Sequence, residues 1–366
     1  MKKLLIITKS LSKNDGQGRY SLDLIKRLKD EYQLVIFYFQ EPENREADVR
    51  YYRLGNLFFS WRFFRELKSA DLVHSFSDYP YCLLPFWPWF SSKKSIFITA
   101  HGTYGVEPLD RAKGSFLLKR AYRKAKKVIC VSKFTERQIL KRIKLSNAIV
   151  VNNGVDYGKF QKSNVQQKTE NKKIILSVGA LKPRKGYHIS IPAIAEVKKK
   201  YPDVKYCIVG GKPPETYLRM IKDNNLSENV VFFENISDEE LINLYYQSDI
   251  FLLPSVTENE NDFEGFGLVY LEAGACGKPV IGAFGSGAED AIIDGETGIL
   301  VPQNDVKKTV EAILKLLDNP IMAQKMGENG KKRAEEMNWD NTVKKYIEIY
   351  KKIIHLNGVV NNRILG

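Results

Sequence analysis

The sequence predicts an α/β protein with two doubly wound parallel-sheet domains. Short apolar runs with strand character alternate with helical patterns from one end of the chain to the other, and this alternation is typical of parallel sheets flanked by helices. The chain has 366 residues, 43% of them hydrophobic, which suffices for two cores of ordinary size and argues against disorder. A polar stretch near the middle separates the apolar runs into two series.

Six runs in the first half and six in the second are expected to form strands. The first six are Leu4–Thr8, Leu34–Tyr38, Leu72–His74, Ser95–Thr99, Val128–Val131 and Ile149–Val151. The second six are Ile174–Val178, Tyr206–Val209, Val230–Phe232, Ile250–Leu253, Pro279–Ile281 and Ile299–Val301. The first run follows two lysines but is too short for a signal peptide, so we interpret it as the opening strand.

The polar stretch gives the expected domain boundaries. Residues 161–173 are polar apart from Val165 and predict a linker. We therefore expect a first domain over residues 1–160 and a second over 174–335, followed by a helix within 336–366. In this last segment apolar residues recur at helical spacing, at Val343, Tyr346, Ile347, Tyr350, Ile353 and Ile354.

The segment most informative about function holds two glutamates, Glu264 and Glu272, eight positions apart. Glu264 sits in a glycine-rich loop, and we expect Glu272 about two turns into the apolar helix that follows. At roughly 3.6 residues per turn the two carboxylates lie near one face, beside N–H groups that favour an anion such as a diphosphate. From the spacing alone, a buried amphipathic helix with two incidental glutamates is the better interpretation.

The sequence around the two glutamates favours a functional role for them. The run from Phe263 to Ile281 resembles the signature of the retaining glycosyltransferases of family 4, which have the GT-B architecture. Further motifs of that family follow one another in its order over most of the chain. They are Gly16-Gln17-Gly18, Thr99-Ala100-His101-Gly102, Val151-Asn152-Asn153-Gly154, Pro183-Arg184-Lys185-Gly186 and Asp294-Gly295-Glu296-Thr297-Gly298.

The resemblance implies a GT-B fold, in which two Rossmann-like domains face a central cleft and the C-terminal helix crosses back to the first domain. It implies that the first domain binds the acceptor and the second the nucleotide sugar. The expected reaction is the retaining transfer of a hexose from a UDP-sugar or GDP-mannose type of donor to a hydroxyl. The donor is a substrate, and the resemblance implies neither a cofactor nor a metal; no Asp-x-Asp motif or metal-ligand spacing opposes this.

Most candidate site residues lie in the second domain. Arg184 and Lys185 suit a diphosphate, because arginine offers a planar fork of donors and lysine a point charge. The resemblance implies that Glu264 contacts sugar hydroxyls and that Glu272 accepts hydrogen bonds from the ribose. It also implies that the backbone N–H groups of Gly265, Phe266, Gly267 and Leu268 reach the sugar or phosphate.

Four candidates come from the first domain. His101 is expected at a strand end, the usual position for function in an open α/β sheet, and the resemblance places it near the donor sugar. Gly16 and Gly18 permit close approach of the first loop to the donor, although a simple helix start explains them equally. Asn153 is a second-rank candidate near the cleft, as is Asp290 in the second domain.

One departure from the family leaves a second hypothesis open. Many relatives carry arginine directly after the strand glycine, where this chain has Ala180. The alternative function is therefore a catalytically inactive GT-B partner that binds nucleotide sugar or membrane. A phosphorylase would need a pyridoxal-binding lysine context, which the sequence does not show.

The charge of +14 indicates an anionic partner. From Arg111 to Lys144 there are thirteen Lys or Arg residues and one acidic residue, Glu136. With Phe116-Leu117-Leu118 beside it, this run favours an anionic membrane surface over a solvated helix face. Nucleic acid is not expected, because no recognised binding motif accompanies the charge. The Pro-broken aromatic run Tyr79–Phe90, with Phe58–Phe64, suits either an interfacial surface or ordinary packing.

These features together suggest where the protein works. The four cysteines are scattered, which is typical of the cell interior. We expect a cytoplasmic protein, peripheral at the inner face of the cell membrane, with a lipid-linked saccharide or glycolipid as acceptor in cell-envelope polysaccharide synthesis. The sequence indicates neither the donor base nor the oligomeric state.

Overall fold

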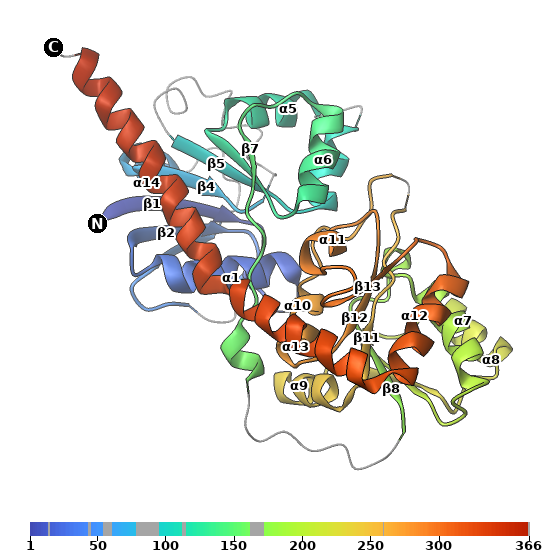
Figure 1. The fold of residues 1–366 in the computed structure, drawn as a ribbon. Helices are drawn as coiled ribbons and strands as arrows, with labels where there is room; N and C mark the ends of the chain where they lie inside the picture. Colours follow the sequence, from blue (N-terminus) through green and yellow to red (C-terminus); the bar gives the residue numbers. More distant parts are fainter. Residues whose placement is uncertain are drawn as a thin grey trace. The chain divides into compact units, whose positions relative to one another are not determined.

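The computed structural model describes residues 1–13, 15–42, 45–53, 61–77, 95–111, 115–161, 172–258 and 260–364. The chain divides into two compact units (Figure 1). Unit 1 comprises Met1–Asn153 with Trp339–Gly366, and unit 2 is Gly154–Asn338. Most of the expected linker, residues 162–171, and the aromatic run Tyr79–Phe90 lie outside the described residues.

Residues 154–160, grouped with the first domain in the sequence analysis, belong to unit 2. Hydrogen bonds explain this placement. The Val155 amide donates to the Met337 carbonyl at 2.9 Å. The Tyr246 hydroxyl donates to the carbonyl of Phe160 at 2.6 Å.

Unit 1 contains a seven-stranded sheet of order β3-β2-β1-β4-β5-β6-β7, in which every pairing is parallel. Its strands are β1 (Lys2–Thr8), β2 (Tyr32–Tyr38), β3 (Arg50–Arg53), β4 (Leu72–Ser75), β5 (Ser95–Ala100), β6 (Lys127–Cys130) and β7 (Ala148–Val150). The expected strands of this half are all present. The edge strand β3 was not expected, because its sequence Arg-Tyr-Tyr-Arg lacks an apolar run.

Helices connect these strands. They are α1 (Gly16–Leu28), α2 (Trp61–Ser69), α4 (Thr103–Val106), α5 (Ser115–Lys124) and α6 (Lys133–Arg142), with the short 3-10 helix η3 (Glu107–Leu109). The last helix of the chain, α14 (Trp339–Ile364), also belongs to unit 1.

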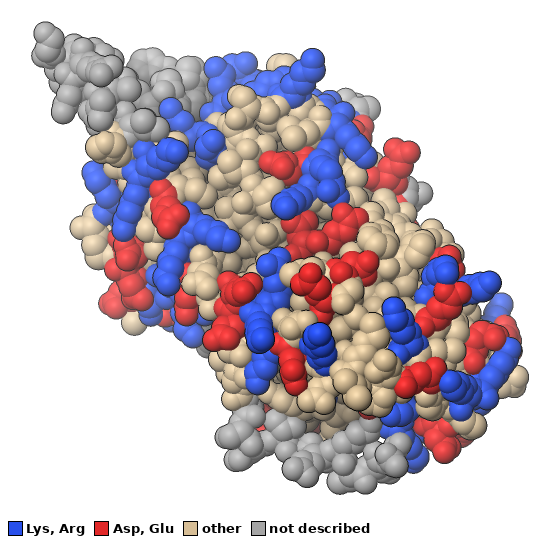
Figure 2. Space-filling view, in the orientation of Figure 1, with Lys and Arg blue, Asp and Glu red and all other residues tan. Residues whose placement is uncertain are grey.

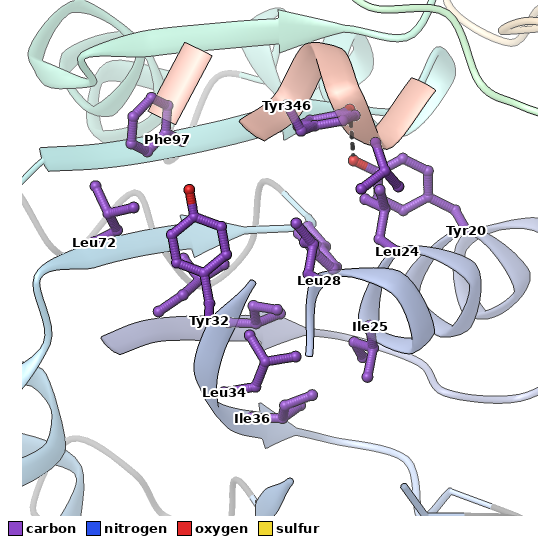
Figure 3. Close-up of a cluster of buried hydrophobic side chains, with 14 of the residues drawn as sticks. Tyr20, Leu24, Ile25, Leu28, Tyr32, Leu34, Ile36, Leu72, Phe97 and Tyr346 are labelled. Atoms are coloured by element: carbon purple, nitrogen blue, oxygen red, sulfur yellow. Dashed lines mark hydrogen bonds between the residues drawn. The ribbon is translucent and has the colours of Figure 1, made fainter. Parts of the chain in front are cut away.

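Helices α1 and α14 pack together over one face of the sheet (Figure 1). Because side chains alternate along a strand, Leu4 and Ile6 of β1 point to this face, where they join a buried cluster with Leu24 of α1. Helix α14 contributes four buried side chains to the same cluster: Trp339, Val343, Tyr346 and Tyr350. Figure 3 shows part of this cluster, with the hydroxyls of Tyr20 and Tyr346 hydrogen bonded at 2.8 Å.

A buried chain of hydrogen bonds runs through this core. The Tyr20 hydroxyl contacts Thr99 Oγ1 at 3.0 Å, and His74 Nε2 contacts the same oxygen at 2.9 Å. The other nitrogen of His74 bonds to the Tyr350 hydroxyl. Burial holds the pKa of His74 well below its usual value, so its ring is neutral. His74 is therefore a structural residue that joins α14 to the sheet.

Substituting phenylalanine for Tyr350 should test this connection. The change keeps the buried ring but leaves His74 Nδ1 without its partner, and an unsatisfied buried polar group costs about 1–3 kcal/mol. We expect a loss of that size in the free energy of unfolding, measured by urea denaturation. The matched control is Tyr51→Phe, whose half-buried hydroxyl accepts a bond of 3.3 Å from the Glu46 amide. A loss no larger than in the control would contradict the structural role of the pair.

Unit 2 contains a six-stranded sheet of order β10-β9-β8-β11-β12-β13, again parallel throughout. Its strands are β8 (Ile174–Val178), β9 (Lys205–Gly210), β10 (Val230–Glu234), β11 (Ile250–Leu252), β12 (Val280–Ala283) and β13 (Gly298–Val301). The chain moves from β8 outward to β10 and then returns to the other side of β8 at β11. The order of strands therefore reverses between β8 and β11.

The helices of unit 2 complete the doubly wound design. They are α7 (Tyr187–Lys198), α8 (Glu215–Asp223), α9 (Asp238–Gln247), α10 (Leu268–Ala275), α11 (Ala288–Ala291), α12 (Val306–Asp318) and α13 (Pro320–Glu336). Two 3-10 helices, η4 (Tyr157–Phe160) and η5 (Pro183–Lys185), lie in loops. The α/β class with two parallel sheets, predicted from the alternation of elements, is confirmed.

Candidate active site

The candidate residues of unit 2 gather where its strand order reverses. Arg184 and Lys185 follow β8, and Glu264 lies in the loop after β11, the neighbouring strand. Loops at the carboxyl ends of such a strand pair diverge and leave a crevice, which is the usual ligand position in open α/β sheets. The topology thus brings together residues that are some eighty positions apart in sequence.

A tight turn presents the two cations. Pro183 begins η5 and Gly186 ends it in the left-handed region, at φ 74°. A Cβ atom on Gly186 would lie 2.0 Å from the carbonyl oxygen of Pro254, so only glycine lets this turn reach the loop after β11. Close contact between the two loops therefore requires Gly186.

Both cations are paired with Glu264. Lys185 Nζ lies 2.5 Å from Glu264 Oε2, and Arg184 NH1 lies 3.3 Å from the same oxygen. Lys185 and Glu264 are 9% and 8% exposed, so the pair is largely shielded from water. Burial acts to raise the pKa of Glu264, but Lys185 and Arg184 outweigh it and hold that pKa below its usual value. Glu264 is therefore ionised at neutral pH.

The loop that follows Glu264 is fixed by contacts with the β12–α11 connection. The Gly287 amide donates to the Glu264 carbonyl at 2.8 Å. Gly267 adopts φ 82°, a left-handed conformation that glycine accepts readily, and the helix begins at the next residue. The segment of Gly265, Phe266, Gly267 and Leu268 therefore leads directly into the N-terminus of α10. That its N–H groups reach the sugar or phosphate stays a prediction.

The position of Glu272 differs from the expectation. We expected it two turns into the helix, but α10 begins at Leu268, so Glu272 lies about one turn in. The left-handed Gly267 explains the late start. The Tyr245 hydroxyl donates to Glu272 Oε2 at 2.8 Å. Glu272 is buried, and its role toward a ribose stays a prediction.

Gly16 and Gly18 form the first turn of α1 in unit 1. The Asp15 side chain caps this helix by accepting a hydrogen bond from the Gly18 amide at 2.8 Å. A Cβ atom on Gly18 would lie 2.0 Å from the Ser12 carbonyl oxygen, whereas one on Gly16 would meet nothing within 4 Å. Packing therefore explains why position 18 is glycine, but it does not explain the glycine at position 16.

His101 follows β5 and lies against the start of α1. Its ring is 4.4 Å from that of Tyr20, in an edge-to-face arrangement. Burial lowers the pKa of His101 to about 4, against the opposing effects of a hydrogen bond to the Phe76 backbone and of Asp15. Within the described ranges Nε2 has no hydrogen-bond partner, so Nδ1 donates to the Phe76 carbonyl. A neutral ring protonated on Nδ1 offers Nε2 as an acceptor.

The lowered pKa of His101 predicts a loss of stability in acid. The unfolded chain binds a proton near pH 6.5 that the folded protein accepts only near pH 4, so stability falls as pH drops through that interval. Between pH 7.5 and pH 5 this residue should account for about 2 kcal/mol of lost unfolding free energy. The measurement is denaturant unfolding of wild type and His101→Gln at both pH values. We expect the unfolding free energy of His101→Gln to fall less than that of wild type between the two pH values. An equal fall in both proteins would contradict the prediction. The matched control is His188→Gln in α7.

The remaining candidates are Asn153 and Asp290. Asn153 follows β7, the edge strand opposite β3 in unit 1, and its buried Oδ1 has no partner among the described residues. Asp290 is buried in α11, and its carbonyl accepts a hydrogen bond from Arg333. Ala180 is exposed. In the ranges that the structure describes, no group of three or more His, Cys, Asp and Glu side chains could hold a metal ion.

Two contacts of the site were not predicted from the sequence. Asp262 Oδ1 lies 3.2 Å from Arg184 Nε. Tyr245 bonds to Glu272 from α9, which precedes β11. Neither Asp262 nor Tyr245 belongs to a motif, and each is distant in sequence from the residue that it contacts.

Comparisons with known proteins identify the family of the chain. Residues 14–159 match the model described as Glycosyltransferase Family 4, and residues 158–333 match that of Glycosyl transferases group 1. In structure, the chain is similar to HepE of Anabaena in complex with UDP, with a TM-score of 0.81 and 19% identity over 96% of this chain and 100% of that one. The chain belongs to the family 4 glycosyltransferases, has the GT-B fold, and is a transferase enzyme.

Two relatives illustrate the range of the similarity. An uncharacterized glycosyltransferase of Methanocaldococcus jannaschii is 28% identical over 90% of this chain and 93% of its own length. The GDP-mannose-dependent alpha-(1-6)-phosphatidylinositol monomannoside mannosyltransferase of Mycolicibacterium smegmatis is 39% identical, but over 45% of this chain and 44% of its own. The latter match thus spans less than half of the named mannosyltransferase.

Proposed function

We propose that the protein is a retaining hexosyltransferase that uses a nucleotide-diphosphate sugar. The observation that carries this proposal is the meeting of Arg184, Lys185 and Glu264 at the strand reversal of unit 2, beside the N-terminus of α10. Two cations suit a diphosphate, a carboxylate suits sugar hydroxyls, and a helix N-terminus favours negative charge.

The names of similar proteins support a donor of this class. HepE of Anabaena has been crystallised with UDP and with UDP-glucose. Two of the mannosyltransferase relatives, from Mycolicibacterium smegmatis and Corynebacterium glutamicum, are described as GDP-mannose-dependent. These descriptions favour UDP-sugar or GDP-mannose type donors for this chain and do not separate the two.

Each site residue then has a chemical task. When the bond from the sugar to the diphosphate breaks, negative charge grows on the leaving oxygen, and Arg184 and Lys185 would stabilise it in a largely dry site. Glu264, kept ionised, would accept hydrogen bonds from sugar hydroxyls. In unit 1, neutral His101 would accept a hydrogen bond from a saccharide hydroxyl through Nε2. Retention would follow from acceptor attack on the leaving-group face.

The nature of the acceptor is suggested by the surface of unit 1. Lys and Arg side chains gather over α5 and α6 (Figure 2). Phe116 of α5 is 65% exposed beside them, whereas Leu118 is buried. No helix among the described residues is long and apolar enough to cross a membrane. We therefore propose peripheral binding to an anionic bilayer and an acceptor that is a lipid-linked saccharide or glycolipid.

Vesicle flotation tests the membrane proposal. Wild type should float with vesicles containing anionic lipid and not with neutral ones, and Phe116→Ser combined with Lys119→Gln should float less. A matched control changes Lys307 and Lys308 of α12 in unit 2 to Gln. Absence of wild-type binding to anionic vesicles would overturn this part of the proposal while leaving the donor site untouched.

A thermal-shift panel with UDP, GDP, ADP and CDP tests the donor proposal. A ligand at about 100 times its dissociation constant adds roughly 2.7 kcal/mol of stability. We expect one nucleotide to stabilise the protein selectively, and transfer from the corresponding sugar donor to give a product of unchanged anomeric configuration by NMR. No shift with any of the four would favour the alternative of a catalytically inactive GT-B protein, which the alanine at position 180 motivates.

A further inference from the structure

The phosphate-binding cations of unit 2 are already neutralised by two carboxylates. Lys185 is paired with Glu264 at 2.5 Å, and Arg184 Nε is paired with Asp262 Oδ1 at 3.2 Å. Arg184 NH1 also reaches Glu264 at 3.3 Å and the Phe263 carbonyl at 3.5 Å. The formal charges of these four side chains cancel, so a diphosphate meets no net positive charge from them.

Asp262 is held in place by its own loop. The Glu258 amide donates to the Asp262 carbonyl at 2.7 Å, and the Asp262 amide donates back to the Glu258 carbonyl at 2.9 Å. The Thr257 amide donates to Gln303 Oε1 at 2.8 Å, which ties the start of the loop to the segment after β13. Because the backbone on both sides is fixed, Asp262 meets Arg184 with little cost in chain ordering.

The two carboxylates differ in how easily a ligand could displace them. Glu264 is 8% exposed and lies on the loop that leads into α10. The Asp262 side chain is 40% exposed, and that of Arg184 is 17% exposed. Water can therefore solvate Asp262 once it leaves Arg184, whereas Glu264 would stay buried and charged. Asp262 is the carboxylate that a phosphate can replace at the lower cost.

We propose that Asp262 competes with the donor diphosphate for Arg184 and thereby limits the affinity for the nucleotide. This inference rests on the proposed function, because it assigns the contacts of Arg184 to a diphosphate. Binding would exchange the Arg184–Asp262 pair for an Arg184–phosphate pair, and release of the nucleoside diphosphate would restore it. Asp262 then weakens the binding of the product as well as that of the donor. Weaker product binding favours turnover when product release is slow.

The test compares Asp262→Asn with Glu258→Gln by titration calorimetry, using whichever of UDP, GDP, ADP and CDP binds the wild type. Both variants remove one negative charge from the same loop, but only the first removes the partner of Arg184. We expect Asp262→Asn to lower the dissociation constant about five- to twentyfold relative to Glu258→Gln. The gain should shrink in 0.5 M salt, where the Debye length is only a few ångströms.

The outcomes separate the inference from the proposed function. Equal affinities in the two variants, or weaker binding by Asp262→Asn in a folded protein, would overturn the role of Asp262 alone. Asp262→Ala provides a second variant and should show the same gain. Absence of binding by every nucleotide to all of these proteins would overturn the proposed function, and the inference with it.

Discussion

Replacement of Lys185 by alanine should lower kcat/KM for sugar transfer by about 10²–10³-fold, because removing one donor that stabilises developing charge has an effect of that size. Lys185 is the cation nearest to Glu264, at 2.5 Å, and is 9% exposed. Bulk water therefore cannot replace its charge. Steady-state kinetics with the donor identified by the nucleotide panel would measure the effect.

The control for this prediction lies in the same turn. Lys182 is exposed and immediately precedes η5, so Lys182→Ala removes an equal charge from the neighbouring surface. We expect it to change kcat/KM by less than about threefold, since exposed charges are screened. Similar losses in both variants would mean that the general charge of the loop, and not the contact of Lys185, supports transfer.

A double variant separates activity from stability. Among the described side chains, the buried carboxylate of Glu264 in Lys185→Ala keeps the longer contact with Arg184 as its one ion pair. The unfolding free energy should therefore fall by about 1–3 kcal/mol. Adding Glu264→Gln removes the charge that lacks its main partner and should recover part of that stability without restoring transfer. Additive losses in urea denaturation would show that the two side chains do not interact.

The substitution Gly287→Ala is also expected to have a large effect, on both nucleotide binding and stability. A Cβ atom there would lie 2.2 Å from the carbonyl oxygen of Gly265 and 2.5 Å from the Phe266 amide nitrogen. Both are backbone atoms, so no side-chain rotation can relieve the overlap, and the loop that carries Glu264 must move. Overpacking of this kind costs about 1–3 kcal/mol or more. We expect weaker nucleotide binding together with a lower melting temperature.

Gly158→Ala is the control for this substitution. Its nearest neighbour would be an Asp156 carboxylate oxygen at 3.9 Å, which is an ordinary contact. Thermal unfolding with and without the bound nucleotide would compare the two variants. Unchanged nucleotide binding in Gly287→Ala would show that the Glu264 loop tolerates displacement.

The strands were predictable because their chemistry is local. Buried parallel strands consist of nearly continuous apolar residues, as in Leu4–Thr8 and Ile174–Val178. The structure has a strand at both positions. The edge strand β3 carries arginines at both ends and tyrosines between them, so it lacks the apolar signal. The class of protein came from motifs spread along the chain, and the family matches confirm it.

The contacts within the site were less predictable. Resemblance placed Arg184, Lys185 and Glu264 in one functional site, but no local pattern indicates that they bind one another across nearly eighty residues. The start of α10 depends on the backbone conformation of Gly267, which moved Glu272 to the first full turn of the helix. No local pattern around Asp262 indicates its ion pair, because its partner Arg184 follows a different strand.

The place of α14 in the core of unit 1 has a consequence for synthesis on the ribosome. Trp339, Val343, Tyr346 and Tyr350 of α14 fill a core whose other buried members lie within Met1–Asn153, more than 180 residues earlier in the chain. The whole of Gly154–Asn338 is synthesised in between. Nascent unit 1 must therefore wait with the α14 side of its core uncovered while unit 2 already has all of its residues. Unit 2 can therefore finish folding before unit 1, which reverses the usual N-to-C order in which domains fold during synthesis. A chaperone that shields apolar surface would bind the nascent chain at unit 1.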